Sequence, residues 1–358
     1  MLYKYEFIKN SKMRELSFHF LFFIKRIRNI KPKDKFVPKN YFHKKFLNKN
    51  GEIAPKGRFN KALDRSFKDF FNSYKARPQD QKDEFYKLII FSNNIHLYFE
   101  NHLITDVIKL KNDNIKKIIG DDSFSQLMKE LWSYLSNSNN SWEIDEHYKE
   151  FYKKLPPSKM CPFCGLDKLS NPDLYRADYD HIAYKYVYPI STITLKNLAP
   201  SCPDCNQKFK KTKDVFFDNL NQRCIFLYPY KSSQKIEIDL SGSVIPNTEI
   251  MNTSGNWVIN IIPENDFSKT WDIIYDIKVR YKDAIQHDKW TRQLIKNLSI
   301  NNIHLNSSIE VQEYLNKYKE MYNPNELEVG YHIKYAYYNY LATSNNNIYY
   351  SQILKLIA

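Results

Sequence analysis

A chain of 358 residues is longer than one small module, and typical domain sizes predict two or three units that each bury a core. Hydrophobic residues make up 42% and charged residues 26% of the chain, and its 7 glycines and 15 prolines exclude the fibrous and low-complexity classes. The formal net charge is +14, which favours binding to a polyanion such as nucleic acid.

The positive charge is concentrated at the N-terminus. From Met1 to Arg77 there are 21 Lys and Arg against 6 Asp and Glu, whereas the other residues carry 33 basic and 34 acidic side chains. This distribution favours a polyanion-binding face in the first region. The alternative is compositional drift in a chain rich in Lys, Asn, Ile and Tyr, although drift would spread the charge evenly.

Within this basic region, residues 31–61 are rich in Lys and interrupted by Pro, with aromatic residues at Phe36, Tyr41, Phe42 and Phe46. The cations are suited to phosphates and the rings to stacking on bases. The alternative is a solvated loop whose rings pack inward. From Asp83 to Ser136, apolar residues recur at spacings of three and four, which predicts helices.

Towards the C-terminus, alternating apolar and polar residues predict two strands, Lys235 to Leu240 and Trp257 to Ile262. Gly242 and Gly255 are expected to supply turns between these strands. Helices should then dominate to the end of the chain.

Two helix starts are expected in this last region. The capping box at Ser307 predicts a helix that runs to about Tyr322, and Asn323-Pro324 predicts the start of the next. That second helix carries the aromatic run Tyr331 to Tyr340, which we expect to pack in the core.

Four of the five cysteines form two CxxC pairs, at Cys161 and Cys164 and at Cys202 and Cys205. Two such pairs suit a closed, tetrahedral, structural zinc site, because each pair chelates from one turn. A disulfide framework would need more cysteines in a short secreted chain, and no secretory signal is visible. The cysteines alone also fit a bare zinc ribbon that serves as a binding module.

The most apolar N-terminal stretch, Phe18 to Ile24, is far shorter than the ~20 residues that span a bilayer. With cysteines spaced for metal, we expect a protein of the reducing cytoplasm that does not enter a membrane.

The segment enclosed by the cysteines contains further polar residues at informative spacings. Asp180-His181 is followed 16 residues later by Asn197-Leu198, and Asn206 directly follows Cys205. Over about 50 residues the chain resembles the HNH, or ββα-metal, endonuclease family, whose pattern runs DH, NL and CxxC followed by His or Asn over a β-hairpin and a helix. It departs from many relatives at Tyr184, where they have Pro, and at Phe209, where they have Lys.

The resemblance implies metal-assisted hydrolysis of phosphodiester bonds. His181 would be the general base that activates water. Asp180 and Asn206 would hold a catalytic Mg²⁺ or Mn²⁺, and Asn197 would orient the His or fix the hairpin loop. Each residue alone has an ordinary alternative, such as a surface turn for Asp180-His181 or a helix cap for Asn206.

Basic residues on either side of this motif are candidates for backbone phosphate contacts, although a charge run on a helix is often only solvated. These residues are Arg176, Lys208, Lys210, Lys211 and Lys213.

Taken together, the sequence predicts an α+β fold with three regions. Residues 1–155 form a basic, mainly helical region, residues 156–228 a ββα-metal nuclease module with a four-cysteine zinc, and residues 229–358 a mixed region with a short β-hairpin and several helices. The expected activity is endonucleolytic, on DNA in preference to RNA. An RNA-directed nuclease and a non-catalytic zinc-containing module that binds nucleic acid or a partner protein remain alternatives.

The resemblance extends to HNH effectors of bacterial anti-phage systems, and this implies an ATPase or sensor protein as a partner. One active site cuts one strand, so cleavage of both strands would need a homodimer, a second chain or two sequential events.

Overall fold

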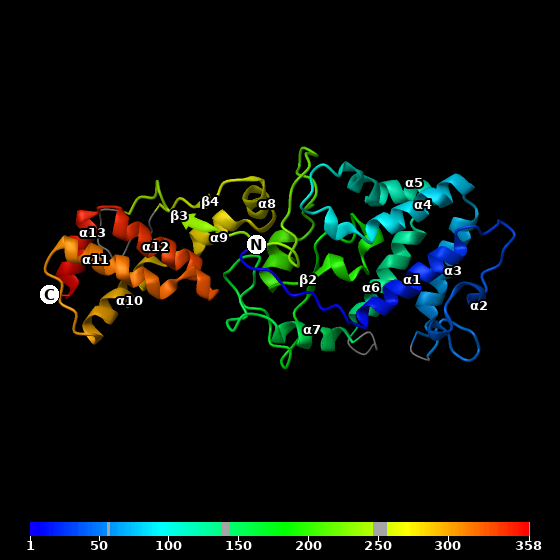
Figure 1. The fold of residues 1–358 in the computed structure, drawn as a ribbon, viewed down its shortest axis with the longest axis horizontal. Coiled ribbons are helices and arrows are strands. Elements are labelled where there is room, and N and C mark those ends of the chain that lie inside the picture. The colour runs from blue at the N-terminus through cyan, green and yellow to red at the C-terminus, as the bar shows by residue number, and fades with distance from the viewer. Residues whose placement is uncertain (56–57, 138–142, 246–255, 358) are drawn as a thin grey trace. The chain divides into compact units, whose positions relative to one another are not determined.

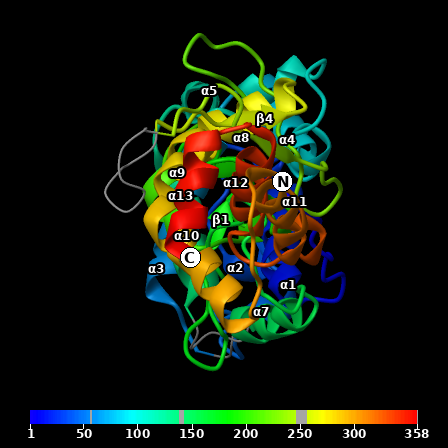
Figure 2. The same ribbon diagram turned by 90° about the vertical axis from the view of Figure 1, so that its left-hand side faces the viewer.

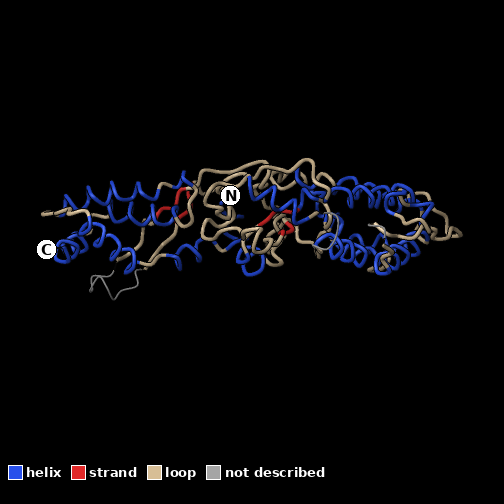
Figure 3. Tube along the Cα trace, turned by 90° about the horizontal axis from the view of Figure 1, so that it is seen from below, coloured by secondary structure: helices blue, strands red, loops and turns tan. Residues whose placement is uncertain are grey.

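The structure is a computed structural model that describes residues 1–55, 58–137, 143–245 and 256–357. Helices make up most of the regular structure of these residues, and the strands are short (Figure 3). The strands of the described chain form two antiparallel pairs. The predicted α+β class is therefore confirmed, and the turn expected at Gly255 lies outside the described residues.

The chain forms two compact units, each assembled from separate segments. Unit 1 comprises residues 1–4, 155–169 and 232–358, and unit 2 comprises residues 5–154 and 170–231.

Unit 2 begins with helices and ends with a strand pair and a π-helix. Its helices and strands, in chain order, are α1 (Met13–Ile27), α2 (Pro38–Tyr41), η1 (Lys44–Phe46), α3 (Lys61–Lys75), α4 (Gln79–Ser92), η2 (Ile95–Leu97), η3 (Thr105–Leu110), α5 (Asn112–Ile119), α6 (Ser123–Ser136), α7 (Ile144–Lys153), β1 (Tyr179–His181), η4 (Pro189–Ser191), η5 (Leu195–Asn197), β2 (Leu198–Pro200) and η6 (Asp204–Lys210).

Helices α1, α3, α4 and α6 lie in the same part of unit 2 (Figure 1). Buried phenylalanine side chains fill the core between them. Phe23 of α1 meets Phe67 of α3 with ring centroids 4.9 Å apart, and Phe85 of α4 meets Phe124 of α6 at 5.0 Å. Both pairs are edge-to-face, the arrangement that aromatic quadrupoles favour. The helices predicted between residues 83 and 136 are therefore present, and each buries one face.

The Lys-rich segment 31–61 splits into a buried and an exposed set of side chains. Phe42 and Phe46 are buried and stack on each other, and Phe42 also stacks on Phe23 at 4.8 Å. These rings pack inward, as the solvated-loop alternative expects, and are not surfaces for base stacking. The lysines that flank them are exposed, namely Lys31, Lys33, Lys35, Lys44 and Lys45.

Unit 1 contains a strand pair followed by helices. Its elements are β3 (Glu237–Asp239), β4 (Asn260–Ile262), α8 (Asp266–Tyr275), α9 (Ile277–Ala284), α10 (His287–Ile300), α11 (Ser308–Tyr318), η7 (Lys319–Tyr322), η8 (Pro324–Glu326), α12 (Tyr331–Thr343) and α13 (Asn347–Ile357). The predicted hairpin is confirmed, since β3 pairs antiparallel with β4, Ile238 opposite Ile261, and Gly242 adopts the left-handed conformation (φ 87°) beyond β3.

The last helices of unit 1 pack together, with α11 against α12 and α13, and α13 against α10 (Figure 2). Ser307 caps α11 by accepting from the backbone N–H of Glu310 at 3.3 Å, as predicted. The following helix does not begin at Asn323-Pro324, because only the 3₁₀ turn η8 forms there and α12 starts at Tyr331. Tyr337 and Tyr338 of α12 are buried, as expected for core packing, whereas Tyr331, Tyr335 and Tyr340 of the same run are only half-buried.

Among the described residues, no helix combines the length and apolar character that a membrane span requires.

Candidate functional site

The first CxxC pair lies on a tight turn that is closed by backbone hydrogen bonds. Met160 and Lys168 form an isolated antiparallel bridge, and the backbone N–H of Gly165 donates to the Cys161 carbonyl at 2.8 Å. The N–H of Leu166 points to Cys164 Sγ at 3.4 Å. Gly165 has φ 69°, a conformation that side chains with a Cβ rarely adopt. The turn therefore presents two sulfur atoms on one side.

The second pair is carried by the end of a strand and the start of a helix. Cys202 follows β2, and Cys205 lies on η6, whose first turn includes a bond from Asn206 N–H to the Cys202 carbonyl at 3.1 Å.

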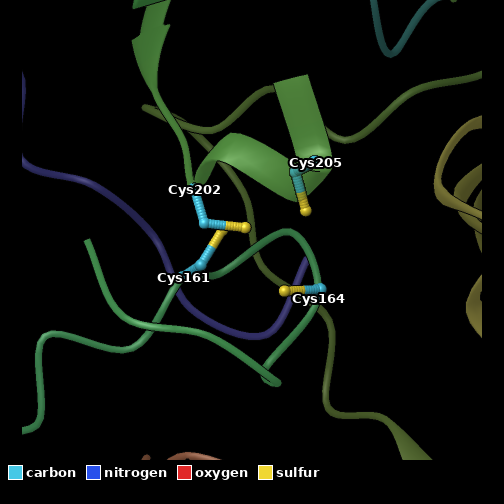
Figure 4. Close-up of side chains that lie close together, drawn as sticks. All are labelled: Cys161, Cys164, Cys202 and Cys205. Atoms are coloured by element: carbon cyan, nitrogen blue, oxygen red, sulfur yellow. The ribbon is translucent and has the colours of Figure 1, made fainter. Parts of the chain in front are cut away.

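All four sulfur atoms are buried and lie within 4.8 Å of one another (Figure 4). Four thiolates around one zinc are expected about 3.8 Å apart, given a Zn–S distance of about 2.3 Å and a tetrahedral shell. This cluster can therefore hold a structural metal ion such as zinc.

Asp180 and His181 lie on β1, which pairs with β2 in the register Asp180 opposite Ala199 and His181 opposite Leu198. Both side chains are buried. The two residues are therefore placed by a strand ladder within the protein and not by an exposed turn, which was the ordinary alternative for such a pair.

The imidazole of His181 is held on two sides. Its Nε2 lies 3.0 Å from the main-chain oxygen of Thr192, and its ring meets the ring of Trp132 with centroids 4.3 Å apart. Because a carbonyl only accepts, Nε2 carries the proton, and the lone pair of the neutral ring is on Nδ1. Burial, assisted by the charge of Lys185, holds the pKa of His181 well below its usual value, so the neutral form predominates at pH 7.

The carboxylate of Asp180 has one paired and one unpaired oxygen. Its Oδ1 accepts from the Lys210 ammonium at 2.8 Å, while its Oδ2 is buried without a hydrogen-bond partner among the described residues. Burial raises the pKa of Asp180, and the positive charge of Lys210 opposes that rise. An orphaned buried carboxylate oxygen is an energetic cost, and a divalent cation is one group that would relieve it.

Lys210 is fully buried, although the sequence placed it among the phosphate contacts. Its ammonium also donates to the His181 carbonyl at 2.7 Å, so it braces both residues of the Asp-His pair. Lys210 is therefore not available to a phosphate in this structure. The geometry of η6 explains why Lys210 is buried. This element is a π-helix, in which Lys211 N–H donates to the Asn206 carbonyl five residues earlier. Its wide turn directs the Lys210 side chain inward.

Asn197 is buried behind the hairpin loop and holds its main chain. Its Oδ1 accepts from Ala183 N–H at 2.8 Å, and its Nδ2 donates to the Ala183 carbonyl at 3.0 Å and the Ser191 carbonyl at 3.3 Å. Of the two roles that the resemblance implied, this geometry corresponds to fixing the loop. The Thr192 carbonyl that holds His181 belongs to the same loop, so Asn197 acts on the His indirectly.

One cavity of about 570 Å³ in unit 2 brings several of the predicted residues together. Asp180, His181 and Asn206 line it, and so do the cations Arg176 and Lys211. Arg176 is tethered by Asp145 at 2.8 Å and by the Ser136 carbonyl at 3.1 Å, so its position at the rim is fixed.

The remaining predicted cations do not line this cavity. Lys208 is exposed on η6 and lies 4.0 Å from Asp204, and Lys213 is half-buried beyond the end of that helix. The helix expected to carry all four lysines ends at Lys210, and Lys211 follows with φ 45°.

Sequence reasoning missed three contributors to the site. Trp132 and Lys185 line the cavity, and Lys185 Nζ lies 5.4 Å from the centroid of the Trp132 ring. Thr192 contributes only a main-chain oxygen, which no side-chain pattern reveals. Trp132 lies on α6, about fifty residues before the motif, and its periodicity there is that of an ordinary helix.

Comparisons of this chain with protein-family models, with characterised proteins and with solved structures find no match. The resemblance to the HNH family that the sequence suggested therefore has no support from these comparisons.

Proposed function

We propose that this protein is a metal-dependent HNH endonuclease that hydrolyses phosphodiester bonds of nucleic acid. The observation that carries the proposal is the cavity of unit 2, in which a tautomer-fixed His181 lies beside Asp180 and Asn206. A bare zinc ribbon has no need for a buried imidazole and an orphaned carboxylate oxygen in one cavity.

His181 is the proposed general base. Since the Thr192 carbonyl keeps the proton on Nε2, Nδ1 is the atom that would take a proton from water. The low pKa keeps the ring neutral and able to accept at pH 7, and the Trp132 ring restricts its rotation. Asn197 fixes the loop that supplies the Thr192 carbonyl.

Asp180 and Asn206 are the residues suited to hold the catalytic divalent cation, because Mg²⁺ and Mn²⁺ prefer oxygen ligands. The unpartnered Oδ2 of Asp180 fits this role. When bound, such an ion supplies charge stabilisation to the transition state and to the leaving oxygen. Arg176 and Lys211 would orient the phosphate backbone from the rim of the cavity.

The four-cysteine cluster is proposed to hold zinc in a structural role. Four thiolates leave no open position for water or substrate, so this ion would not take part in the reaction. The non-catalytic alternative, a zinc-containing binding module, predicts the same zinc without any cleavage.

DNA is the favoured substrate, by resemblance to the family. A role as an effector of anti-phage defence, acting with an ATPase or sensor protein, belongs to the same proposal. An RNA-directed nuclease is the alternative, because the same base and metal attack either backbone.

The decisive experiment incubates the purified protein with plasmid, linear duplex, single-stranded DNA and RNA, each with Mg²⁺ or with EDTA. We expect Mg²⁺-dependent cleavage that leaves 5′-phosphate ends and is absent with EDTA. A protein that binds these substrates without cutting any of them, in Mg²⁺ or Mn²⁺, would establish the binding module instead.

A further inference from the structure

One wall of the cavity that contains Asp180 and His181 is aromatic. Trp132 contributes to it from α6, and Tyr184 and Tyr186 contribute from the loop that follows β1. The ring centroids of Tyr184 and Tyr186 lie 5.4 Å apart, and Tyr186 is 54% exposed. The cavity therefore has a large ring on its wall that a ligand can reach and cover.

Lys185 lies close to two of these rings. Its Nζ is 5.4 Å from the ring centroid of Trp132 and 5.5 Å from that of Tyr186. The residue is half-buried, and burial lowers its pKa, yet its ammonium forms no ion pair among the described residues. The carboxylate that acts on it, Asp178, instead accepts from Gln207 Nε2 at 2.7 Å. A partly buried cation without an acidic partner is suited to an anion from outside the chain.

Positive charge continues on the far side of this wall. A second hollow, of about 60 Å³, shares Trp132, Lys185 and Tyr186 with the cavity. It adds the exposed Lys129, and none of its described lining residues is acidic. The cavity itself is lined by three cations and two acids, namely Arg176, Lys185 and Lys211 with Asp178 and Asp180. A chain of phosphates that enters the cavity therefore meets further cations beyond the aromatic wall.

The combination of cations with reachable rings distinguishes between the forms of a nucleic acid. Cations can follow the phosphates of a single strand or of a duplex equally well. A ring can stack only on a base whose face is uncovered, and in a duplex the neighbouring base pairs cover these faces. Grooves that bind single strands accordingly combine cations for the backbone with aromatic side chains for the bases.

We propose that the cavity of unit 2 binds single-stranded nucleic acid, with the ring of Tyr186 stacked on an unpaired base and the ammonium of Lys185 on a neighbouring phosphate. The strand form of the substrate is thereby set beside His181, at the wall of the same cavity. This inference rests on the proposed nuclease function, because it names the substrate class of that site.

The test measures binding to the full chain by fluorescence anisotropy, in EDTA so that no cleavage occurs. The probe is a labelled oligodeoxynucleotide, presented as a single strand and as a blunt duplex. The unchanged protein should bind the single strand more tightly than the duplex, and an RNA strand of the same sequence shows which backbone it prefers.

Two variants test the two contacts. Tyr186→Ala should weaken binding of the single strand at least about fivefold, the loss expected for one base–ring stack, whereas Tyr186→Phe keeps the ring and should bind like the unchanged protein. Lys185→Gln should flatten the slope of log affinity against log salt concentration by ~0.7, as expected for one lost phosphate contact of a single strand.

The matched control is Tyr175→Ala, because Tyr175 is 61% exposed and lines neither hollow. It should bind like the unchanged protein, and circular dichroism should show that all variants fold. Equal affinities of Tyr186→Ala and Tyr175→Ala for the single strand, or tighter binding of the duplex by the unchanged protein, would overturn the inference.

Cleavage in Mg²⁺ is scored separately, so that this inference and the nuclease function can fail independently. A protein that binds single strands through Tyr186 but cuts no substrate would overturn the nuclease function and keep the stacking site. A nuclease whose binding and cleavage are unaffected by Tyr186→Ala would overturn the stacking site and keep the nuclease function.

Discussion

Burial acts in opposite directions on two adjacent residues, Asp180 and His181. It raises the pKa of the carboxyl and lowers the pKa of the imidazole, so in both cases the charged form is disfavoured. For His181 this favours the neutral imidazole at pH 7, which is the form that the proposed base requires. For Asp180 it means that the ionised form depends on a nearby cation, which is Lys210 in this structure.

His181→Ala should lower the cleavage rate by at least ~10²-fold, because it removes the group that is proposed to take the proton from water. The zinc content and the circular dichroism spectrum should be unchanged. The rates are measured in a single-turnover assay with saturating Mg²⁺. His304→Ala, which replaces a histidine far from His181 in the sequence, is the control. Wild-type rates in H181A would remove His181 from the mechanism.

Asp180→Ala and Asn206→Ala should instead weaken the binding of the proposed catalytic divalent cation. Their rates should recover in part as Mg²⁺ or Mn²⁺ is raised, whereas H181A should not recover. A titration of rate against metal concentration distinguishes the two groups, and metal rescue of H181A alone would mean that the roles are assigned wrongly.

Lys210 is the cation that compensates the buried charge of Asp180. Lys210→Met should lower the free energy of unfolding by about 3–5 kcal/mol, because it leaves an uncompensated carboxylate in the interior. The exposed Lys208→Met should stay within about 0.5 kcal/mol of the unchanged protein. Adding Asp180→Asn to K210M should restore part of the loss in urea unfolding, and strictly additive losses would argue against the pair.

At the scale of elements, the turn at residues 160–168 and the first turn of η6 are short and are held mainly by backbone hydrogen bonds. Neither has the length to be stable alone, since isolated helices below about 12–15 residues are marginal in water. The turn carries Cys161 and Cys164, and η6 carries Cys205 with Cys202 just before it. A shared metal ion would therefore contribute stability that local packing does not supply.

About one zinc per chain should therefore co-purify with the protein. Cys161→Ser and Cys202→Ser should lose that zinc and give misfolded or insoluble protein, because a closed four-thiolate shell tolerates no missing ligand. Cys224→Ser, outside the cluster, should retain both zinc and solubility. Elemental analysis that finds no zinc in soluble, active protein would exclude the site.

For the whole molecule, the excess charge of residues 1–77 is carried by exposed lysines on a core of buried rings. Replacing five of these lysines with Gln should weaken nucleic-acid binding. The slope of log affinity against log salt concentration should flatten by up to ~0.9 per lost duplex phosphate contact. The replaced residues are Lys31, Lys33, Lys35, Lys44 and Lys45. The rate at saturating substrate should stay near wild type, since these cations act on ground and transition states alike. A salt titration that gives the same slope for both proteins would assign this surface to protein contacts.

The stability of the whole chain should also depend on buried histidines. Burial lowers the pKa of His147 to about 4, from a usual value near 6.5. Between these values the unfolded chain binds a proton that the folded chain does not, so the free energy of unfolding falls as the pH decreases from about 6.5 towards 4, by up to about 1.4 kcal/mol per pH unit.

Urea unfolding at pH 7, 6 and 5 measures this dependence. His147→Gln removes the titrating group, so its stability should decline less steeply than that of the unchanged protein over the same range. His304→Gln, for comparison, should keep the original slope, and identical slopes for all three proteins would contradict the role of His147.

What the sequence determined by itself is the local chemistry of this chain. Two CxxC pairs indicated a four-thiolate cluster because their spacing lets each turn chelate, and the cluster is present. Alternation at residues 235–240 and 257–262 predicted a hairpin, and helical periodicity predicted α4 to α6, because these patterns depend only on which neighbours along the chain share a face. The aromatic run from Tyr331 to Tyr340 was expected in the core because large rings usually pack there, and Tyr337 and Tyr338 do so.

Tertiary structure alone decided which groups meet across long separations. The burial of Lys210 depends on the wide turn of a π-helix, which residue types do not predict, and it converts an expected phosphate contact into the partner of Asp180. The tautomer of His181 depends on a main-chain carbonyl, and the Trp132 ring reaches it from α6. The unpartnered Nδ1 of His332 is likewise a property of packing, since only a folded interior can separate a polar atom from water.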